Sequence, residues 1–505
     1  MQRKTQKYDS NDEENAISPI LTLAVEIILQ IFVEGTRTWR YLEPQSLPFP
    51  TIAASVCKNW RMIAKSAPQL WALLIPPLHR EHHTCLLWTS QWLERSRKVP
   101  LSVVLDIKLV TTHLDGNWLY QTLETDRKIS EILSLILEGN HIGRLRRLNI
   151  RSFSGRAFNE FMEGLDQSGL FDACGLEQLS LYTLDGEGFG SGHVFSGPPS
   201  CRWDTLQKLP KLRKFGFLNI CPPVPPPVIS TLTSLTTYHG LFLDHAGAKA
   251  LFSGAPYLAH IIIHDVVFRN RRIGPNTDIA ISVPSLRSLA VEMSPSYYDR
   301  IMINRQRAKE TFASLFDYVS IPALEYLEIQ GKFDYDILFA SSLSESLRTV
   351  KKLRIANMDH LGFDDIQSLH SFHAIEELEI VQAPATEILT QVKPSTSSAG
   401  EILWPELRCL TLDTTDVKNI ESCIDLVWTR AALHGSKFRD LKLSKSSIGL
   451  LKVGGLMSER HGKLLDRFED NIGKASSSKL VSLRVLEFPC YGLLDSERVP
   501  MADTL

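Results

Sequence analysis

Residues 145–150 read LRRLNI, a phrase with apolar side chains at its first, fourth and sixth positions. The last two lie on one face of a strand, because successive side chains of a strand alternate between faces. The phrase returns eleven times downstream, with starts 23 to 45 residues apart. These copies are LEQLSL (176–181), LRKFGF (212–217), LTTYHG (235–240), LAHIII (258–263), LRSLAV (286–291), LEYLEI (324–329), VKKLRI (350–355), IEELEI (375–380), LRCLTL (407–412), FRDLKL (438–443) and LRVLEF (483–488). The spacing predicts a series of similar strands.

A strand phrase repeated at this period is typical of leucine-rich repeats, in which each unit is one strand and a returning helix or loop. Such units stack into a curved solenoid, and each unit packs only on its neighbours. We therefore expect an α/β fold, an irregular leucine-rich-repeat solenoid with a parallel strand ladder on its concave face. Because solenoids of this kind present a concave binding surface, the repeat indicates recognition of another macromolecule.

The composition is that of a soluble globular chain, with 44% hydrophobic and 22% charged residues among 505. The formal net charge of −2 gives no sign of the basic surface that nucleic acids require. Eight cysteines without a CxxC pair are typical of reduced thiols in an intracellular protein. No signal-peptide core is found, and no stretch reaches the roughly 20 apolar residues of a membrane span. We expect a cytoplasmic or nuclear protein without membrane or nucleic-acid partners.

The N-terminal part predicts a small helical unit ahead of the repeats. Residues 21–32 (LTLAVEIILQIF) place apolar side chains at helical spacing. Residues 41–50 carry three prolines and predict a loop. A second apolar stripe over 51–66 predicts one helix that ends before Pro68, since the residue before proline disfavours helix. A short third element starts at residue 69.

The chain divides accordingly. A helix, a proline break and the strand LSVVLDI (101–107) are expected between the helical unit and the repeats. The expected divisions are a disordered tail (1–15), the helical unit (16–75), a linking helix and first strand (76–110), the solenoid (111–490) and a C-terminal tail (491–505).

The helical unit resembles an F-box, a three-helix module. The residues that carry the resemblance are Leu23, Glu26, Ile27, Ile31, Phe32, Val56, Cys57, Trp60, Arg61, Pro68, Leu70 and Trp71. Ala24 and Val25 replace the family's proline pair, in which proline helps to start the first helix and contacts the partner. An F-box followed by repeats is similar to F-box proteins of the leucine-rich-repeat class, especially the large families of mushroom-forming fungi.

The resemblance implies that the helical unit binds the Skp adaptor and, through it, a cullin and a RING subunit. The chain would be the non-catalytic substrate receptor of an SCF-type ubiquitin ligase, with a protein cargo on the repeats. Some matching residues must instead hold the helices together, and the sequence does not separate the two groups. The alternative is a non-ligase binding scaffold whose helical unit caps the first repeat. The expected adaptor-binding residues are Leu23, Ile27, Ile28, Ile31, Phe32, Val56, Trp60, Leu70 and Trp71.

Alternation turns the residues between the core positions outward, onto the concave face. They predict a basic zone, then an apolar zone with histidines, then an acidic end. In LTTYHG the outward residues would be Thr237, His239 and Leu241. Apolar side chains exposed on neighbouring strands would mark a binding site, although a register shift of one residue would reverse inside and outside. The expected cargo-binding residues are Arg147, Arg151, Tyr182, Leu218, His239, Leu241, His260, Ile262, His264 and Tyr326.

Residues that bear catalytic or metal chemistry were sought along the whole chain. His79, His82, His83 and Cys85 cluster, but zinc usually takes four ligands in two spaced pairs, and the second pair is missing. The sequence contains no Walker loop, GxSxG elbow or HExxH motif. It therefore predicts no metal, no cofactor and no catalytic residue.

Overall fold

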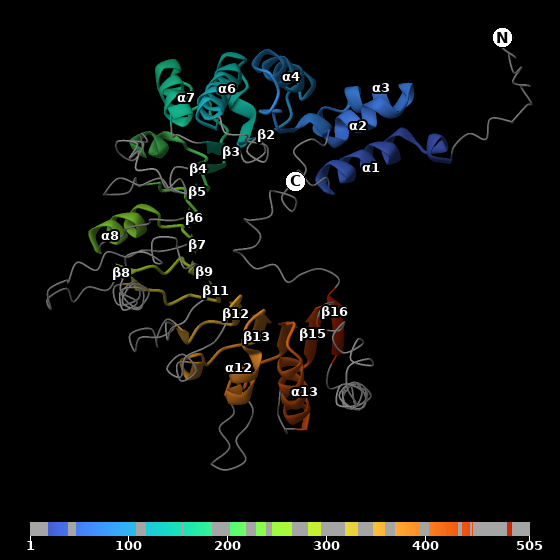
Figure 1. Cartoon of the computed structure of the whole chain (residues 1–505). Coiled ribbons are helices and arrows are strands. Elements are labelled where there is room, and N and C mark those ends of the chain that lie inside the picture. The colour runs from blue at the N-terminus through green and yellow to red at the C-terminus, as the bar shows by residue number, and fades with distance from the viewer. Residues whose placement is uncertain are drawn as a thin grey trace, which may run out of the picture.

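The computed structural model describes residues 19–38, 47–107, 118–152, 156–183, 203–218, 229–238, 245–264, 281–293, 319–331, 347–358, 369–392, 403–432, 437–444, 447 and 482–486. Figure 1 shows the strands of these segments along an arc, with helices on its outer side and a group of helices at its N-terminal end.

In the part of the chain that the structure describes, fourteen strands form one parallel sheet. Strands follow one another in space in chain order, except that β8 (Ile281–Ser282) and β10 (Val319–Ser320) pair separately. The structure thus confirms an α/β fold with a large parallel sheet, and β2 confirms the strand expected at 101–107. The strands are β1 Leu73–Leu74, β2 Leu101–Asp106, β3 Leu145–Ser152, β4 Gln178–Thr183, β5 Lys214–Leu218, β6 Ser234–Tyr238, β7 His260–His264, β9 Ser288–Met293, β11 Tyr326–Gly331, β12 Lys352–Ala356, β13 Glu377–Val381, β14 Cys409–Asp413, β15 Asp440–Ser444 and β16 Ser482–Leu486.

The repeated phrase forms the core of this sheet. Leu327 in β11 is level with Leu289 of β9 and Leu353 of β12, and all three are almost completely buried. The first phrase residue, such as Leu324, is buried in the turn before its strand. The apolar positions therefore stack into columns, as the period of two along each strand predicts.

In two strands, the six-residue phrase starts three residues earlier in the sequence than expected. Leu235 of β6 and Leu483 of β16 lie level with the fourth phrase residue of the strands before them. Their phrases are therefore LTSLTT (232–237) and LVSLRV (480–485), and the predictions LTTYHG and LRVLEF were wrong. Both segments carry leucines three residues apart, so the phrase can be started from either leucine, and only the pairing decides.

Helices of unequal length return the chain along the outer side of the arc (Figure 1). Neighbouring helices pack on each other, α6 on α7 and α12 on α13. In α7, Phe158, Phe161, Met162 and Leu165 are buried at the three-to-four-residue spacing of one helix face. The helices are α6 Trp118–Glu138, α7 Arg156–Ser168, α8 His245–Gly254, α12 Ala385–Val392 and α13 Val417–Ala432.

The N-terminal unit contains α1 (Val25–Thr38), α2 (Phe49–Val56), α3 (Lys58–Ser66) and the 3₁₀ turn η2 (Pro68–Trp71). The single helix predicted over 51–66 was wrong, because the chain is extended at Cys57, with φ −153° and ψ 172°. The Cys57 sulfur accepts a hydrogen bond from the backbone N–H of Trp60 at 3.4 Å and so caps α3. The break gives α2 and α3 separate directions.

The linking segment joins this unit to the sheet without an interruption in the packing. β1 pairs with β2, and α4 (His82–Arg95) contacts η2, β1 and α6. One cluster of buried apolar residues extends from Ile28 in α1 to Leu443 in β15. Among the described residues, no helix combines the length and apolarity needed to cross a membrane.

Candidate functional site

Helix α1 presents apolar residues on two faces. Ile28 and Phe32 are 1% and 0% exposed and pack into the core, whereas Ile27 and Ile31 are 46% and 42% exposed. Leu23, just before the helix, is also exposed. A buried face is what an amphipathic helix requires. Ile27 and Ile31 lie on a neighbouring face of the helix and contribute little to the core, so they are available to a binding partner.

The rest of the unit divides in the same way. Val56 is 58% exposed, whereas Leu70 and Trp71 are buried. The Trp60 ring packs edge-on against Phe32, with 4.9 Å between ring centroids, and is partly buried. Of the nine expected adaptor-binding residues, the structure therefore leaves Leu23, Ile27, Ile31 and Val56 exposed, and assigns Ile28, Phe32, Leu70 and Trp71 to the core.

Sequence reasoning missed further exposed apolar residues of this unit. They lie in α1, just before α2, in α2 and in α3, and only Val25 stands at a position that the family motif defines. They are Val25, Leu47, Ile52 and Met62. A signal was present in α2, where Ile52 and Val56 are four residues apart and share one helix face.

Trp71 connects the N-terminal unit with the linking helix. Its indole N–H donates to the Ala64 carbonyl at 2.8 Å, and its ring packs edge-on against Trp92 at 4.6 Å. The Arg95 guanidinium lies 4.6 Å from the Trp71 ring centroid. Contacts with α3 and α4 at once make this side chain a structural joint rather than a binding residue.

Strand β3 carries the two arginines of the predicted basic zone, Arg147 and Arg151. Arg151 forms an ion pair with Asp106 at 2.9 Å, and its guanidinium lies 5.0 Å from the ring centroid of the buried Tyr182. Arg147 is half-buried on the same strand, and Asn149 lies between the two arginines. Arg151 and Tyr182 are thus engaged with the protein itself, whereas Arg147 has no comparable ion pair among the described residues.

Of the expected exposed apolar zone, the described residues show only Ile262, and it is not exposed. Ile262 is only 3% exposed and packs with Ala290 in a small cluster separate from the main core. This separation from the main core is consistent with the predicted side of the sheet, whereas the predicted exposure of Ile262 was wrong. His264 is also buried, hydrogen-bonded through Nδ1 to Oε2 of Glu292, whereas His260 is exposed.

Three of the expected cargo-binding residues cannot be placed as predicted. The shifted phrase of β6 puts Ser234, Thr236 and Tyr238, not Thr237, level with the concave positions of β5. His239, Leu241 and the side chain of Leu218 lie outside the described residues.

A buried charge network crosses the middle of the concave face. The Arg354 guanidinium is fully buried between Glu328 and Glu379, with an N–O distance of 3.1 Å to each. Lys352 adds a contact of 2.6 Å to Glu379. Burial disfavours the Lys352 ammonium, but the hydrogen bonds and charge of Glu379 and Glu377 outweigh it and raise the Lys352 pKa.

Sequence reasoning noted these charges without pairing them. The signal was present, because Glu328, Arg354 and Glu379 occupy the same phrase position in three consecutive units. Neighbouring strands of a sheet lie about 4.8 Å apart, so equal positions on consecutive strands bring opposite charges into contact.

Tyr326 belongs to this network. Its hydroxyl donates to Oε2 of Glu328 at 2.9 Å. Burial, together with the negative charge of Glu328, raises the pKa of Tyr326 above its usual value. The phenol therefore stays protonated and continues to donate to Glu328 in alkaline solution.

Replacement of Tyr326 by phenylalanine tests this coupling. At pH 8 we expect the free energy of unfolding to fall by about 1.5–3 kcal/mol, because a hydrogen bond to a buried charge is lost. Because the pKa of Tyr326 is higher in the folded chain than in the unfolded chain, its stabilising effect is complete below about pH 10, where free tyrosine ionises. The effect is lost as the pH rises further, because the unfolded chain ionises first. Urea unfolding at pH 8, 10 and 11 should therefore show the two proteins converging. A constant difference across this range would contradict the raised pKa.

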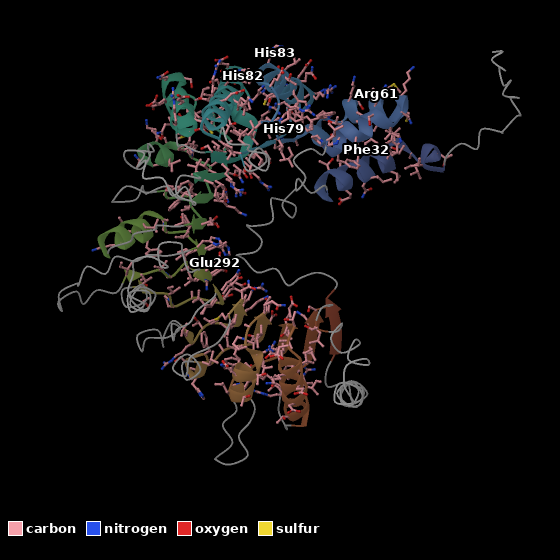
Figure 2. The ribbon with its side chains drawn as sticks, in the orientation of Figure 1. Phe32, Arg61, His79, His82, His83 and Glu292 are labelled. Carbon is pink, nitrogen blue, oxygen red and sulfur yellow. The ribbon has the colours of Figure 1, made fainter. Side chains whose placement is uncertain are left out.

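His79 lies before α4, and His82, His83 and Cys85 lie in its first turn. His82 Nε2 contacts Glu131 Oε2 at 2.6 Å, and burial raises the pKa of the Cys85 thiol to about 11. A protonated thiol is a poor metal ligand, and no potential metal-binding group is found among the described residues. Figure 2 shows His79, His82 and His83 around the start of α4, away from Glu292 on the sheet.

Comparison with known proteins gives no family assignment. No protein-family model matches the chain, and no curated protein matches it. The candidate sites therefore come from the structure alone. They are the apolar surface of the N-terminal helical unit and the concave face of the sheet.

Proposed function

We propose that this chain is the substrate-receptor subunit of an SCF-type ubiquitin ligase, built as an F-box followed by an irregular leucine-rich-repeat array. The observation that carries the proposal is the exposed apolar surface of the helical unit. Leu23, Ile27, Ile31 and Val56 occupy F-box positions and are exposed, while Phe32 and Trp71 form the core beneath. An apolar surface of this kind is typical of a protein-binding site.

The replacement of the family's proline does not prevent the first helix from forming. The carbonyl of Ala24 accepts backbone hydrogen bonds from Ile27 at 3.0 Å and Ile28 at 3.1 Å. The helix thus starts at Val25 without proline, which supports adaptor binding by this unit.

In this proposal the chain performs no bond chemistry. The Skp adaptor and its cullin–RING partner bind at the helical unit, and a protein cargo binds on the concave face, in the cytoplasm or the nucleus. The contribution to catalysis is proximity, which raises the effective concentration of cargo lysines near the conjugating enzyme. The second candidate is a non-ligase protein-binding scaffold, which the missing proline contact at Ala24 favours.

Binding of the full chain to recombinant Skp adaptor tests the proposal. We expect the variant Leu23→Ala/Ile27→Ala/Ile31→Ala to lose at least about 100-fold in affinity, because a few central apolar residues carry most of the binding energy. The three residues are exposed, so the variant should unfold at nearly the wild-type temperature. Isothermal titration calorimetry and thermal unfolding measure the two quantities.

The matched control is Lys58→Ala/Asn59→Ala/Lys65→Ala, which removes three exposed polar side chains from α3 of the same unit. It should bind nearly as well as wild type. A folded wild-type chain that does not bind the adaptor, or a triple apolar variant that binds equally well, would favour the scaffold.

A further inference from the structure

The concave face of strands β2 to β7 is poor in acidic residues among the described positions. The register aligns three concave positions on each strand from β2 to β7. Among these described positions Asp106 is the only acid, and Arg151 engages it. The positions also hold Arg147 and Lys214, so the surface has an excess of positive charge.

Arg147 and Lys214 lie at equal height on strands two steps apart, with Gln178 level between them. Strands β3 and β5 are separated by two strand spacings, or about 10 Å. The long side chains of Arg147 and Lys214 can therefore both contact a group that lies above Gln178. Lys214 is exposed and Arg147 half-buried, and neither has an acidic partner among the described residues. The pair therefore remains available to a ligand.

Arg147 has an unmet hydrogen-bonding requirement. Its Nη1 atom is buried and has no acceptor among the described residues, and the Nε atom of Arg151 is in the same state. Buried donors in proteins nearly always have a partner, and an exception is explained by an ordered water, an ion or a functional role. A guanidinium in this state is best satisfied by an oxyanion, which accepts strong charge-assisted hydrogen bonds.

We propose that Arg147, Gln178 and Lys214 form a binding site for an oxyanion on a peptide segment of the cargo, either a carboxylate or a phosphate ester. Arg151 flanks the site and is held in place by Asp106 and Tyr182. Asn149 and Ser180 lie level with each other in the next row of the ladder and add polar groups beside it.

The other end of the concave face carries charges of both signs. Glu377 and Glu379 are paired with Lys352 and Arg354, and Asp440 shares the concave side of β15 with Lys442. The excess of positive charge therefore lies toward β3–β5, and the acidic part of a cargo segment should bind there.

Fluorescence anisotropy with labelled peptides and the full chain tests the site. The probes are a hexaglutamate peptide, a peptide with two phosphoserines in a glycine–serine background, and the unphosphorylated form as the neutral reference. We expect at least one acidic probe to bind at least tenfold more tightly than the neutral one. We also expect this advantage to shrink as salt rises from 50 to 300 mM, because the contacts are ionic.

The variant Arg147→Gln/Lys214→Gln should lose at least tenfold in affinity for the acidic probe. The matched control Lys211→Gln/Arg213→Gln removes the same charge from exposed positions just before β5, outside the concave rows. It should retain most of the affinity. Both variants should unfold at nearly the wild-type temperature.

The probes also identify the source of the oxyanion. Binding of the phosphoserine probe alone assigns a phosphate ester, and binding of both assigns an acidic segment in general. Equal binding of acidic and neutral probes, or an equal loss in the two double variants, would overturn the site. As a cargo site it rests on the proposed function, but the test contains no adaptor. Failure here therefore leaves the adaptor result unchanged, and the reverse also holds.

Discussion

Replacement of Arg354 by methionine is expected to lower the free energy of unfolding by about 3–5 kcal/mol. The guanidinium is completely buried and contacts two carboxylates, and one of these, Glu328, is itself completely buried. Without Arg354, Glu328 would keep the hydrogen bond from Tyr326 but lose its opposite charge. An uncompensated buried charge is costly because the interior solvates it poorly. Urea unfolding of wild type and variant at pH 8 gives the difference.

The control for this variant breaks an exposed ion pair of the same sheet. Lys437 and Glu406 pair at the surface, with about half and a third of their side chains exposed. Lys437→Ala should cost less than about 1 kcal/mol, because solvent screens exposed pairs. A loss of similar size for Arg354→Met would show that water reaches Glu328 in the folded protein.

Replacement of Trp71 by alanine is expected to cost about 3–5 kcal/mol, because a large buried ring is removed and leaves a cavity. Trp71 is fully buried, donates to Ala64 and packs against Trp92 and Arg95. The damage should be local to the junction between the helical unit and the sheet, since repeats far along an array contact only their neighbours. Thermal unfolding measures the loss of stability of the whole chain. Hydrogen exchange shows which segments lose protection.

The matched variant is Leu87→Ala in α4, which truncates a side chain that is 51% exposed on the same linking helix. It should have little effect on either measurement. Loss of protection throughout β11–β15 in Trp71→Ala would contradict a local role for the joint.

The sequence predicts the parallel sheet because two independent periods agree. Alternation along a strand identifies the buried side chains, and the repeat places them at equal heights, as Leu289, Leu327 and Leu353 show. The prediction failed at Leu235 and Leu483, where a leucine three residues earlier starts an equally good phrase. The six-residue phrase can start at either leucine, and only the pairing with neighbouring strands shows which start is correct.

The candidate site was harder to predict from the sequence, because the burial of each side chain depends on tertiary contacts. Ile27, Ile28 and Ile31 have the same side chain in one helix, yet only Ile28 is buried. The break at Cys57 was missed for a related reason, since the apolar stripe continues across it. On the sheet, Ile262 packs with Ala290 of a neighbouring strand in a cluster apart from the main core, and the sequence did not predict this contact.

The unbroken hydrophobic core from Ile28 to Leu443 has a geometric consequence. Among the described residues, one cluster of buried side chains extends from α1 to β15, so the helical unit and the strands belong to one packed body. A ligand on β3–β5 and one on β13–β15 would stand at different, set distances from whatever binds α1, and the position of a contact along the arc would determine which parts of that ligand come within reach.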